Sequence, residues 1–176
     1  IKRLAGPPYE GAVYTGDEYD PAEVKLLPPC EPTKIVAVGL NYAKHAVEMK
    51  VRLAGKPVLF LKPPTSLIAH GEAIVWPAAS QRVDYEAELA LVIGKKCKGV
   101  SPEEAPDYIF GYTALNDVTA RDLQKADVQW TRAKSFDTFC PVGPYIDTAY
   151  NPAGRRVQCV VDGVVRQEGN TDDMLF

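Results

Sequence analysis

The stretch VDYEAELALVI, residues 83–93, decides the fold class because polar and apolar side chains alternate through most of it. A period of two residues is typical of a β-strand, whose successive side chains point to opposite faces. The sequence therefore predicts one long strand over residues 83–93. Its acidic face carries Asp84, Glu86 and Glu88, and its apolar face carries Tyr85, Ala87, Leu89, Leu91 and Ile93.

Other strand signals surround this stretch. Strands are predicted at residues 34–39 (KIVAVG) and 109–115, and a buried strand is predicted at residues 58–62 (VLFLK). A hairpin is predicted over residues 157–167, because Asp162-Gly163 is a strong two-residue turn signal.

The predicted helices are short and few. One is expected over residues 41–49 with Asn41 as its N-cap, and one over residues 119–125. Ser101-Pro102-Glu103-Glu104 has the pattern of a capping box that opens a third. Many strands without a repeated βαβ unit indicate a mainly β domain with short helices, of the α+β class.

The chain divides into two parts at its proline-rich stretch. Residues 1–32 are rich in Gly and Pro, and they predict a small N-terminal segment with a turn at Thr15-Gly16-Asp17, followed by a linker. Residues 33–176 form the predicted main domain. Because its last residues, Met174-Leu175-Phe176, are apolar with nothing after them to bury against, we expect the chain to end inside that domain.

Composition excludes several classes of protein. The chain has 176 residues, 46% of them hydrophobic and 24% charged, with a net charge of −3 and a pI of about 5.5. This balance gives no attraction to nucleic acid or to an anionic membrane, and no apolar run reaches the roughly 20 residues of a membrane span. No signal peptide opens the sequence, and the four cysteines have no paired spacing. We therefore expect free thiols and a cytoplasmic protein.

Three acids form a candidate metal site. Glu86 and Glu88, two residues apart on a strand, would lie roughly 6.5 Å apart, and carboxylates at that spacing can share one hard cation. Asp117 follows an apolar strand and could join them. The alternatives are a solvated strand face for the two glutamates and a turn or helix-capping aspartate at 117.

A candidate acid–base pair and a candidate anion-binding lysine complete the picture. His45 and Glu48 are three residues apart on the predicted helix, so the carboxylate could orient the imidazole as a general base. Lys134 lies among aromatic residues and could anchor a carboxylate or stabilise an oxyanion. The alternatives are an incidental surface pair and a surface lysine that packs its stem on apolar neighbours.

Taken in order, these segments resemble the fumarylacetoacetate hydrolase family, the group that includes acylpyruvate hydrolases and 2-hydroxyhepta-2,4-diene-1,7-dioate isomerases. The resemblance covers residues 34–176. The matching segments are Gly39-Leu40-Asn41-Tyr42 with His45 and Glu48, Phe60-Leu61-Lys62-Pro63, Tyr85-Glu86-Ala87-Glu88-Leu89, Gly111-Tyr112, Asn116-Asp117-Val118-Thr119-Ala120-Arg121-Asp122 with Gln124, Ala133-Lys134-Ser135-Phe136-Asp137-Thr138 with Pro141 and Gly143-Pro144, and Asn170-Thr171.

The resemblance implies a β-roll catalytic domain, a homodimer, and Mg²⁺ or Mn²⁺ as cofactor. It implies that the metal ligands are Glu86, Glu88 and Asp117, and that His45 and Glu48 are a water-activating pair. It also implies that Lys134 anchors the substrate and that Arg121 and Gln124 lie near the pocket. Leu40 stands where acylpyruvate-cleaving members often carry Arg, so one carboxylate contact would be absent.

The expected function follows from that resemblance. It is a metal-dependent enzyme that acts on small oxo-carboxylates through a metal-stabilised enolate, with hydrolytic C–C cleavage of a β-diketone or acylpyruvate as the first choice. An isomerase or decarboxylase of 2-hydroxy-dienedioates or oxaloacetate is the alternative within the family. A non-enzymatic ligand-binding β-domain is the alternative outside it.

Overall fold

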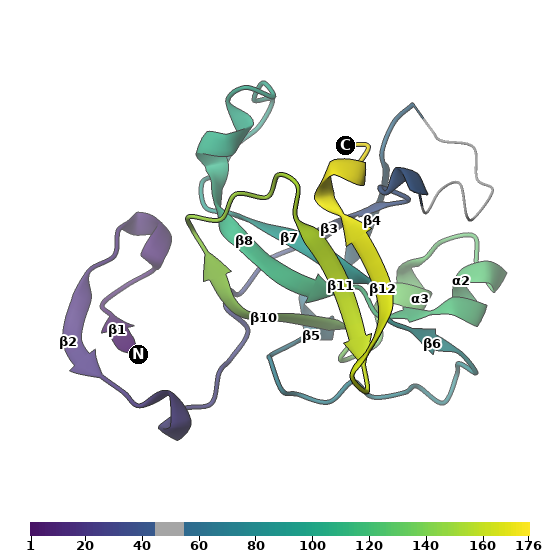
Figure 1. Cartoon of the computed structure of the whole chain (residues 1–176), viewed down its shortest axis with the longest axis horizontal. Helices are drawn as coiled ribbons and strands as arrows, with labels where there is room; N and C mark the ends of the chain where they lie inside the picture. Colours follow the sequence, from purple (N-terminus) through teal and green to yellow (C-terminus); the bar gives the residue numbers. More distant parts are fainter. Residues whose placement is uncertain (45–54) are drawn as a thin grey trace.

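A computed structural model describes residues 1–44 and 55–176 and shows a mainly β protein (Figure 1). Its largest unit is a four-stranded sheet in the order β5-β10-β8-β7. Only the β10–β5 pairing is parallel. The strands of this sheet are β5 (Leu67–Ile68), β10 (Cys140–Asp147), β8 (Ile109–Asn116) and β7 (Ala87–Ile93).

The remaining strands form antiparallel pairs. These pairs are β1 (Lys2–Leu4) with β2 (Tyr14–Glu18), β3 (Ile35–Gly39) with β4 (Val58–Lys62), β6 (Val83–Asp84) with β9 (Thr119–Ala120), and β11 (Arg156–Val161) with β12 (Val164–Asn170). The described helices are short: α2 (Arg121–Ala126), α3 (Thr131–Lys134) and five 3₁₀ turns, Pro8–Glu10, Pro21–Glu23, Pro64–Ser66, Ala105–Tyr108 and Thr171–Asp173. The mainly β prediction with short helices is confirmed.

The predicted hairpin is confirmed in detail. Strands β11 and β12 pair from Arg156↔Asn170 to Val161↔Val164, and Asp162 and Gly163 form the turn with φ of 52° and 76°. Positive φ at both turn residues matches the right-handed twist of the flanking strands, which explains why an Asp-Gly pair is found here.

The predicted long strand over residues 83–93 is wrong, because the chain changes partners in the middle of it. Residues 83–84 form β6 and pair with β9, whereas residues 87–93 form β7 and pair with β8. Tyr85 and Glu86 lie between the two strands. A period of two does not reveal this break, because each short strand keeps the same alternation.

The predicted burial of the strand at residues 58–62 is also wrong, and the apolar face predicted for residues 83–93 is partly exposed. Leu91 and Ile93 on β7 are 51% and 58% exposed, and Leu59 and Leu61 on β4 are 60% and 57% exposed. By contrast, Lys62 at the end of β4 is 1% exposed. The acidic and basic side chains lie on the inner side because they neutralise one another there, which offsets the cost of burying each charge.

Three local predictions need correction. Ser101 and Glu104 do form the reciprocal capping hydrogen bonds, but a turn and the 3₁₀ helix Ala105–Tyr108 follow in place of an α-helix. Asn41 does not act as the predicted N-cap toward any described residue. Its side-chain oxygen accepts from the backbone N–H of Phe176 and so links two distant segments of the chain. Thr15-Gly16-Asp17 lies inside β2 and forms no turn between strands.

A small apolar cluster lies between α3 and β9. It is formed by Val118, Ala120, Ala133 and Phe139, each 0–1% exposed, with Val83, Leu123 and Phe136 packed against it. Val118 follows Asp117 in sequence, and Ala133 precedes Lys134. Burial of these apolar neighbours, at about 25 cal/mol per Å², therefore fixes the backbone from which both charged side chains project.

The first two strands stand apart from the main body in Figure 1, and Tyr9 contacts that body through an edge-to-face pair with Phe110, with ring centroids 6.3 Å apart. All four cysteines are free. Within the described residues, no helix is long and apolar enough to cross a membrane.

Candidate functional site

The site forms where two strand pairs meet. Glu86 lies at the junction of β6 and β7, and Asp117 lies at the junction of β8 and β9. The backbone N–H of Asp117 donates to the carbonyl of Glu86 at 2.8 Å, and the N–H of Glu86 donates to the side chain of Asn116 at 2.9 Å. These bonds hold the two carboxylates side by side. Glu86 reaches this position because residues 83–84 pair with β9 and residues 87–93 pair with β8, which leaves Glu86 between the two strands.

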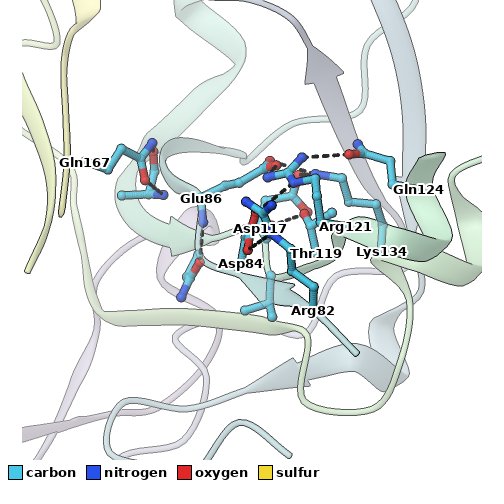
Figure 2. Close-up of polar contacts among 12 residues, drawn as sticks. Arg82, Asp84, Glu86, Asp117, Thr119, Arg121, Gln124, Lys134 and Gln167 are labelled. Carbon is cyan, nitrogen blue, oxygen red and sulfur yellow. Dashed lines mark hydrogen bonds and ion pairs between the residues drawn. The ribbon is translucent and has the colours of Figure 1, made fainter. Parts of the chain in front are cut away.

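Lys134 joins the two carboxylates. Its Nζ donates to Glu86 Oε2 at 2.6 Å and to Asp117 Oδ2 at 2.6 Å, and its side chain is 2% exposed. The same Nζ lies 5.0 Å from the ring centroid of Phe60, and Phe60 packs edge-to-face on Trp130. Figure 2 shows Glu86, Asp117 and Lys134 pointing toward one another.

Lys62 holds Asp117 from the other side. Its Nζ donates to Asp117 Oδ1 at 2.7 Å and to the backbone carbonyl of Lys134 at 2.5 Å. Burial lowers the pKa of the Lys62 ammonium, although the charge of Asp117 opposes that shift. Each oxygen of Asp117 therefore has its own buried ammonium group.

Arg121 supports the acidic residues from α2. Its Nε donates to Asp84 at 3.0 Å, one Nη donates to Glu86 Oε1 at 2.6 Å, and the other donates to Gln124 at 2.6 Å (Figure 2). Burial raises the pKa of Asp84, but Arg82 and Arg121 outweigh burial and hold that pKa below its ordinary value. In this arrangement Arg121 orients Glu86, and Gln124 orients Arg121.

Glu88 is partly buried beside this group. Burial, reinforced by the negative charges of Glu86 and Asp117, raises the pKa of Glu88 to about 8. The buried hydroxyl of Tyr42 lies beside it and makes no hydrogen bond of standard geometry with the described residues. Burial and the charge of Glu88 raise the pKa of Tyr42 as well.

The structure brings together most of the residues singled out in the sequence. Glu86, Asp117 and Lys134 are in direct contact, and Arg121 with Gln124 adjoins them. Glu88 interacts with the same group through charge. His45 and Glu48 lie outside the described residues.

Sequence reasoning missed Lys62 as a site residue. The available signal was a lysine at the end of an apolar strand, directly before Pro63-Pro64. A charged side chain at that position either pairs with an opposite charge in the interior or turns toward solvent. Asp84 and Arg82 were also left without a specific role, and both now belong to the ion-pair network around Arg121.

The donor set suits a hard divalent cation, because carboxylate oxygens are the ligands that Mg²⁺ and Mn²⁺ prefer. Glu86 Oε2 and Asp117 Oδ2 already converge on one cationic atom, Lys134 Nζ. In the described part of the chain, no three acidic, histidine or cysteine side chains meet at the spacing of a metal site. A cation that used both of these oxygens would be repelled by the positive charge of Lys134.

The sequence of the chain matches a known protein family. The family model described as fumarylacetoacetate (FAA) hydrolase C-terminal matches residues 34–176, most of the chain. The chain belongs to the fumarylacetoacetate hydrolase family. The family resemblance and the fold class predicted from the sequence are thereby confirmed.

Individual relatives agree with this assignment. An uncharacterised protein of Methanocaldococcus jannaschii is 52% identical over 161 residues, which are 92% of this chain and 65% of the relative. The mitochondrial oxaloacetate tautomerase fahd2 of Xenopus laevis is 42% identical over 156 residues, 86% of this chain and 49% of the relative. The chain thus spans about half to two thirds of these curated relatives.

Two solved structures share the fold. A 2-hydroxyhepta-2,4-diene-1,7-dioate isomerase from Mycobacterium marinum superimposes with a TM-score of 0.90 at 44% identity, covering 99% of this chain and 65% of that one. A maleylpyruvate hydrolase from Sphingobium, in complex with manganese(II) and pyruvate, gives a TM-score of 0.73 at 34% identity, covering 96% of this chain and 58% of that one.

Proposed function

We propose that this protein is a divalent-metal enzyme that acts on small oxo-carboxylates, with Glu86, Glu88 and Asp117 as ligands of Mg²⁺ or Mn²⁺. The observation that carries the proposal is the buried meeting of Glu86, Asp117 and Lys134, with nitrogen–oxygen distances of 2.6 Å. A similar protein of known structure was solved with manganese(II) and pyruvate, an oxo-carboxylate, which supports both the metal and the substrate class.

The chemistry of the cation is that of a Lewis acid, which withdraws electron density from a keto oxygen and favours the enolate of the substrate. The chain's own residues do the remaining work. Lys134, once its ammonium is free of the carboxylates, donates to a substrate carboxylate or to the oxygen on which negative charge develops. Arg121 keeps Glu86 oriented through its 2.6 Å hydrogen bond.

Hydrolytic C–C cleavage is the first choice of reaction. His45, oriented by Glu48, would take a proton from a water molecule as its oxygen attacks the distal carbonyl of a β-diketone or acylpyruvate. The C–C bond beside that carbonyl would then break, which releases a carboxylic acid and an enolate, and the proton held by His45 would pass to the enolate carbon. The presence of this pair, three residues apart in the sequence, favours a hydrolase. A homodimer remains part of this proposal.

Keto–enol isomerisation is the second candidate, and a specific observation favours it. Two of the similar proteins are an isomerase of a 2-hydroxy-dienedioate and an oxaloacetate tautomerase. These reactions need the same carboxylates and a proton-transferring group, but they need no attacking water.

A product assay separates these reactions. Full-length protein with Mg²⁺ or Mn²⁺ is incubated with acylpyruvates, oxaloacetate and 2-hydroxy-dienedioates, and the products are resolved by NMR. We expect turnover that EDTA abolishes and added Mn²⁺ restores. Turnover that is insensitive to EDTA would contradict the metal-dependent proposal. The product that forms fastest identifies the main reaction.

The affinity for Mn²⁺ is expected to rise with pH. Because the pKa of Glu88 is raised to about 8 in the metal-free site, this carboxyl is mostly protonated at pH 6, and ligation has to release its proton. The dissociation constant should therefore fall by up to about tenfold per pH unit below pH 8 and level off above it.

Calorimetric titrations of Mn²⁺ at pH 6, 7 and 8 in buffers of different ionisation enthalpy measure both the affinity and the protons released. Glu88→Gln cannot ionise, so its affinity should be weaker and its pH dependence shallower. Equal affinity and equal proton release in parent and Glu88→Gln would exclude Glu88 as a ligand.

A further inference from the structure

Asp117 is held from two sides by two buried lysines. Lys62 Nζ donates to Oδ1 at 2.7 Å, and Lys134 Nζ donates to Oδ2 at 2.6 Å. The lysine side chains are 0% and 2% exposed, and that of Asp117 is 8% exposed. The two ammonium groups carry the same charge and contact the same carboxylate, but they differ in what else they hold.

Lys62 is bound to the protein framework. It projects from β4, and its Nζ also donates to the backbone carbonyls of Lys134 and, at 3.5 Å, Val118. Those carbonyls belong to the segments that carry Lys134 and Asp117 themselves. Lys62 therefore fixes the position of Asp117 relative to α3. Its three acceptors use all three N–H groups of the ammonium, so none is left to bind a substrate.

Among the described residues, the hydrogen bonds of Lys134 Nζ go only to the carboxylates of the site. It is the last residue of the four-residue helix α3, and its Nζ lies 2.6 Å from Glu86 Oε2 and 2.6 Å from Asp117 Oδ2. A divalent cation needs carboxylate oxygens at about 2.0–2.6 Å. A divalent cation that used the same two oxygens would lie close to the ammonium nitrogen, and the two positive charges would repel each other.

We infer that Lys134 is an internal cation that occupies the metal position when the divalent cation is absent and leaves these oxygens when it binds, while Lys62 keeps Asp117 in place throughout. The inference rests on the proposed function, because it takes Glu86 and Asp117 as metal ligands. It explains how two buried carboxylates are neutralised before metal arrives. It also makes Lys134 available to a substrate only after the metal is bound.

The inference predicts opposite effects for two substitutions that remove the same charge from the same carboxylate. In Lys134→Met the metal position is no longer occupied, so Mn²⁺ should bind about tenfold more tightly if Lys134 holds the site about nine-tenths of the time. In Lys62→Met one oxygen of Asp117 loses its support, so Mn²⁺ should bind about 10–100-fold more weakly.

Calorimetric titration of Mn²⁺ alone into metal-free, full-length protein measures these affinities. Lys125→Met removes an exposed lysine from α2 and should stay within about twofold of the parent, because solvent and salt screen its charge. Thermal melts in EDTA show whether each variant is folded. Crystal structures of the parent with and without Mn²⁺ give a second measurement that needs no variant, and Lys134 Nζ should move away from both oxygens when Mn²⁺ binds.

Each outcome supports or overturns the inference. Tighter binding by Lys134→Met with weaker binding by Lys62→Met supports it. Equal tightening in both variants would mean a general charge effect, and weaker binding by Lys134→Met would mean that Lys134 assists the cation. Either result, or an unmoved Lys134 in the Mn²⁺-bound crystal, overturns the inference and leaves the proposed function intact. No Mn²⁺ binding by parent or variants overturns both.

Discussion

Asp117→Asn should lower the free energy of unfolding of the metal-free protein by about 3–5 kcal/mol, the cost of removing one partner from a buried ion pair. The substitution keeps the size of the side chain and removes its charge. The amide oxygen of the substituted side chain can accept from only one of the two ammonium groups, and the NH₂ group faces the other. Beyond that oxygen, Lys62 keeps its backbone carbonyls and Lys134 keeps Glu86 as acceptors. Since Lys62 is fully buried, water cannot replace the lost carboxylate.

Urea unfolding in EDTA, followed by circular dichroism, measures this effect. Asp127→Asn is the matched control, because Asp127 pairs with Arg132, whose side chain is 57% exposed, and such pairs contribute at most about 1 kcal/mol. Adding Lys62→Met to Asp117→Asn should recover part of the loss, because it removes the uncompensated buried ammonium. A loss below 1 kcal/mol for Asp117→Asn, or no recovery in the double variant, would contradict the buried network.

The sequence predicted those parts of the fold that depend on neighbouring residues. The turn at Asp162-Gly163 has a local cause, since the two residues adopt positive φ and set the register of β11 and β12. The capping box at Ser101 and Glu104 is local too, and its hydrogen bonds form although the helix after it does not. The helix is missing because a cap satisfies backbone groups without supplying the packing that most helices need.

The sequence could not predict features that depend on distant partners. The break at Glu86 arises because β6 pairs with β9 while β7 pairs with β8. Lys62 is buried because Asp117, 55 positions further along the chain, neutralises it. Alternation grouped the apolar side chains of residues 83–93 on one face but could not tell whether another element covers that face, and Leu91 and Ile93 are half exposed.

The candidate site shows the same division. Spacing and position along the chain singled out Glu86, Glu88, Asp117 and Lys134, and the family resemblance added Arg121 and Gln124. The pairwise contacts could not be predicted: Arg121 engages Asp84, Glu86 and Gln124, and so acts on the carboxylates in this structure. Three neighbouring carboxylates do not by themselves require a bound cation, because Lys62, Lys134 and Arg121 supply positive charge.

His45→Ala and Glu48→Gln should each lower kcat for a hydrolysed substrate by about 10²–10⁴-fold, the usual cost of losing a general base or its orienting partner. The two residues are three apart in the helix that the sequence predicts over residues 41–49, and on a helix that spacing places both side chains on one face. A carboxylate beside an imidazole raises its basicity and fixes its orientation. Mn²⁺ affinity should stay near that of the parent, because neither residue is a proposed ligand.

Steady-state kinetics, with metal content and thermal melts measured in parallel, test this pair against His70→Ala. His70 is the other histidine of the chain and is exposed, so its removal should leave kcat within about twofold of the parent. If His45→Ala and Glu48→Gln are folded, metal-loaded and within threefold of the parent, the pair has no role in the chemistry. If they lose hydrolysis but keep isomerisation, the pair serves only to activate water. The faster activity of the parent then decides between the two candidate reactions, because both use the same carboxylates and Lys134.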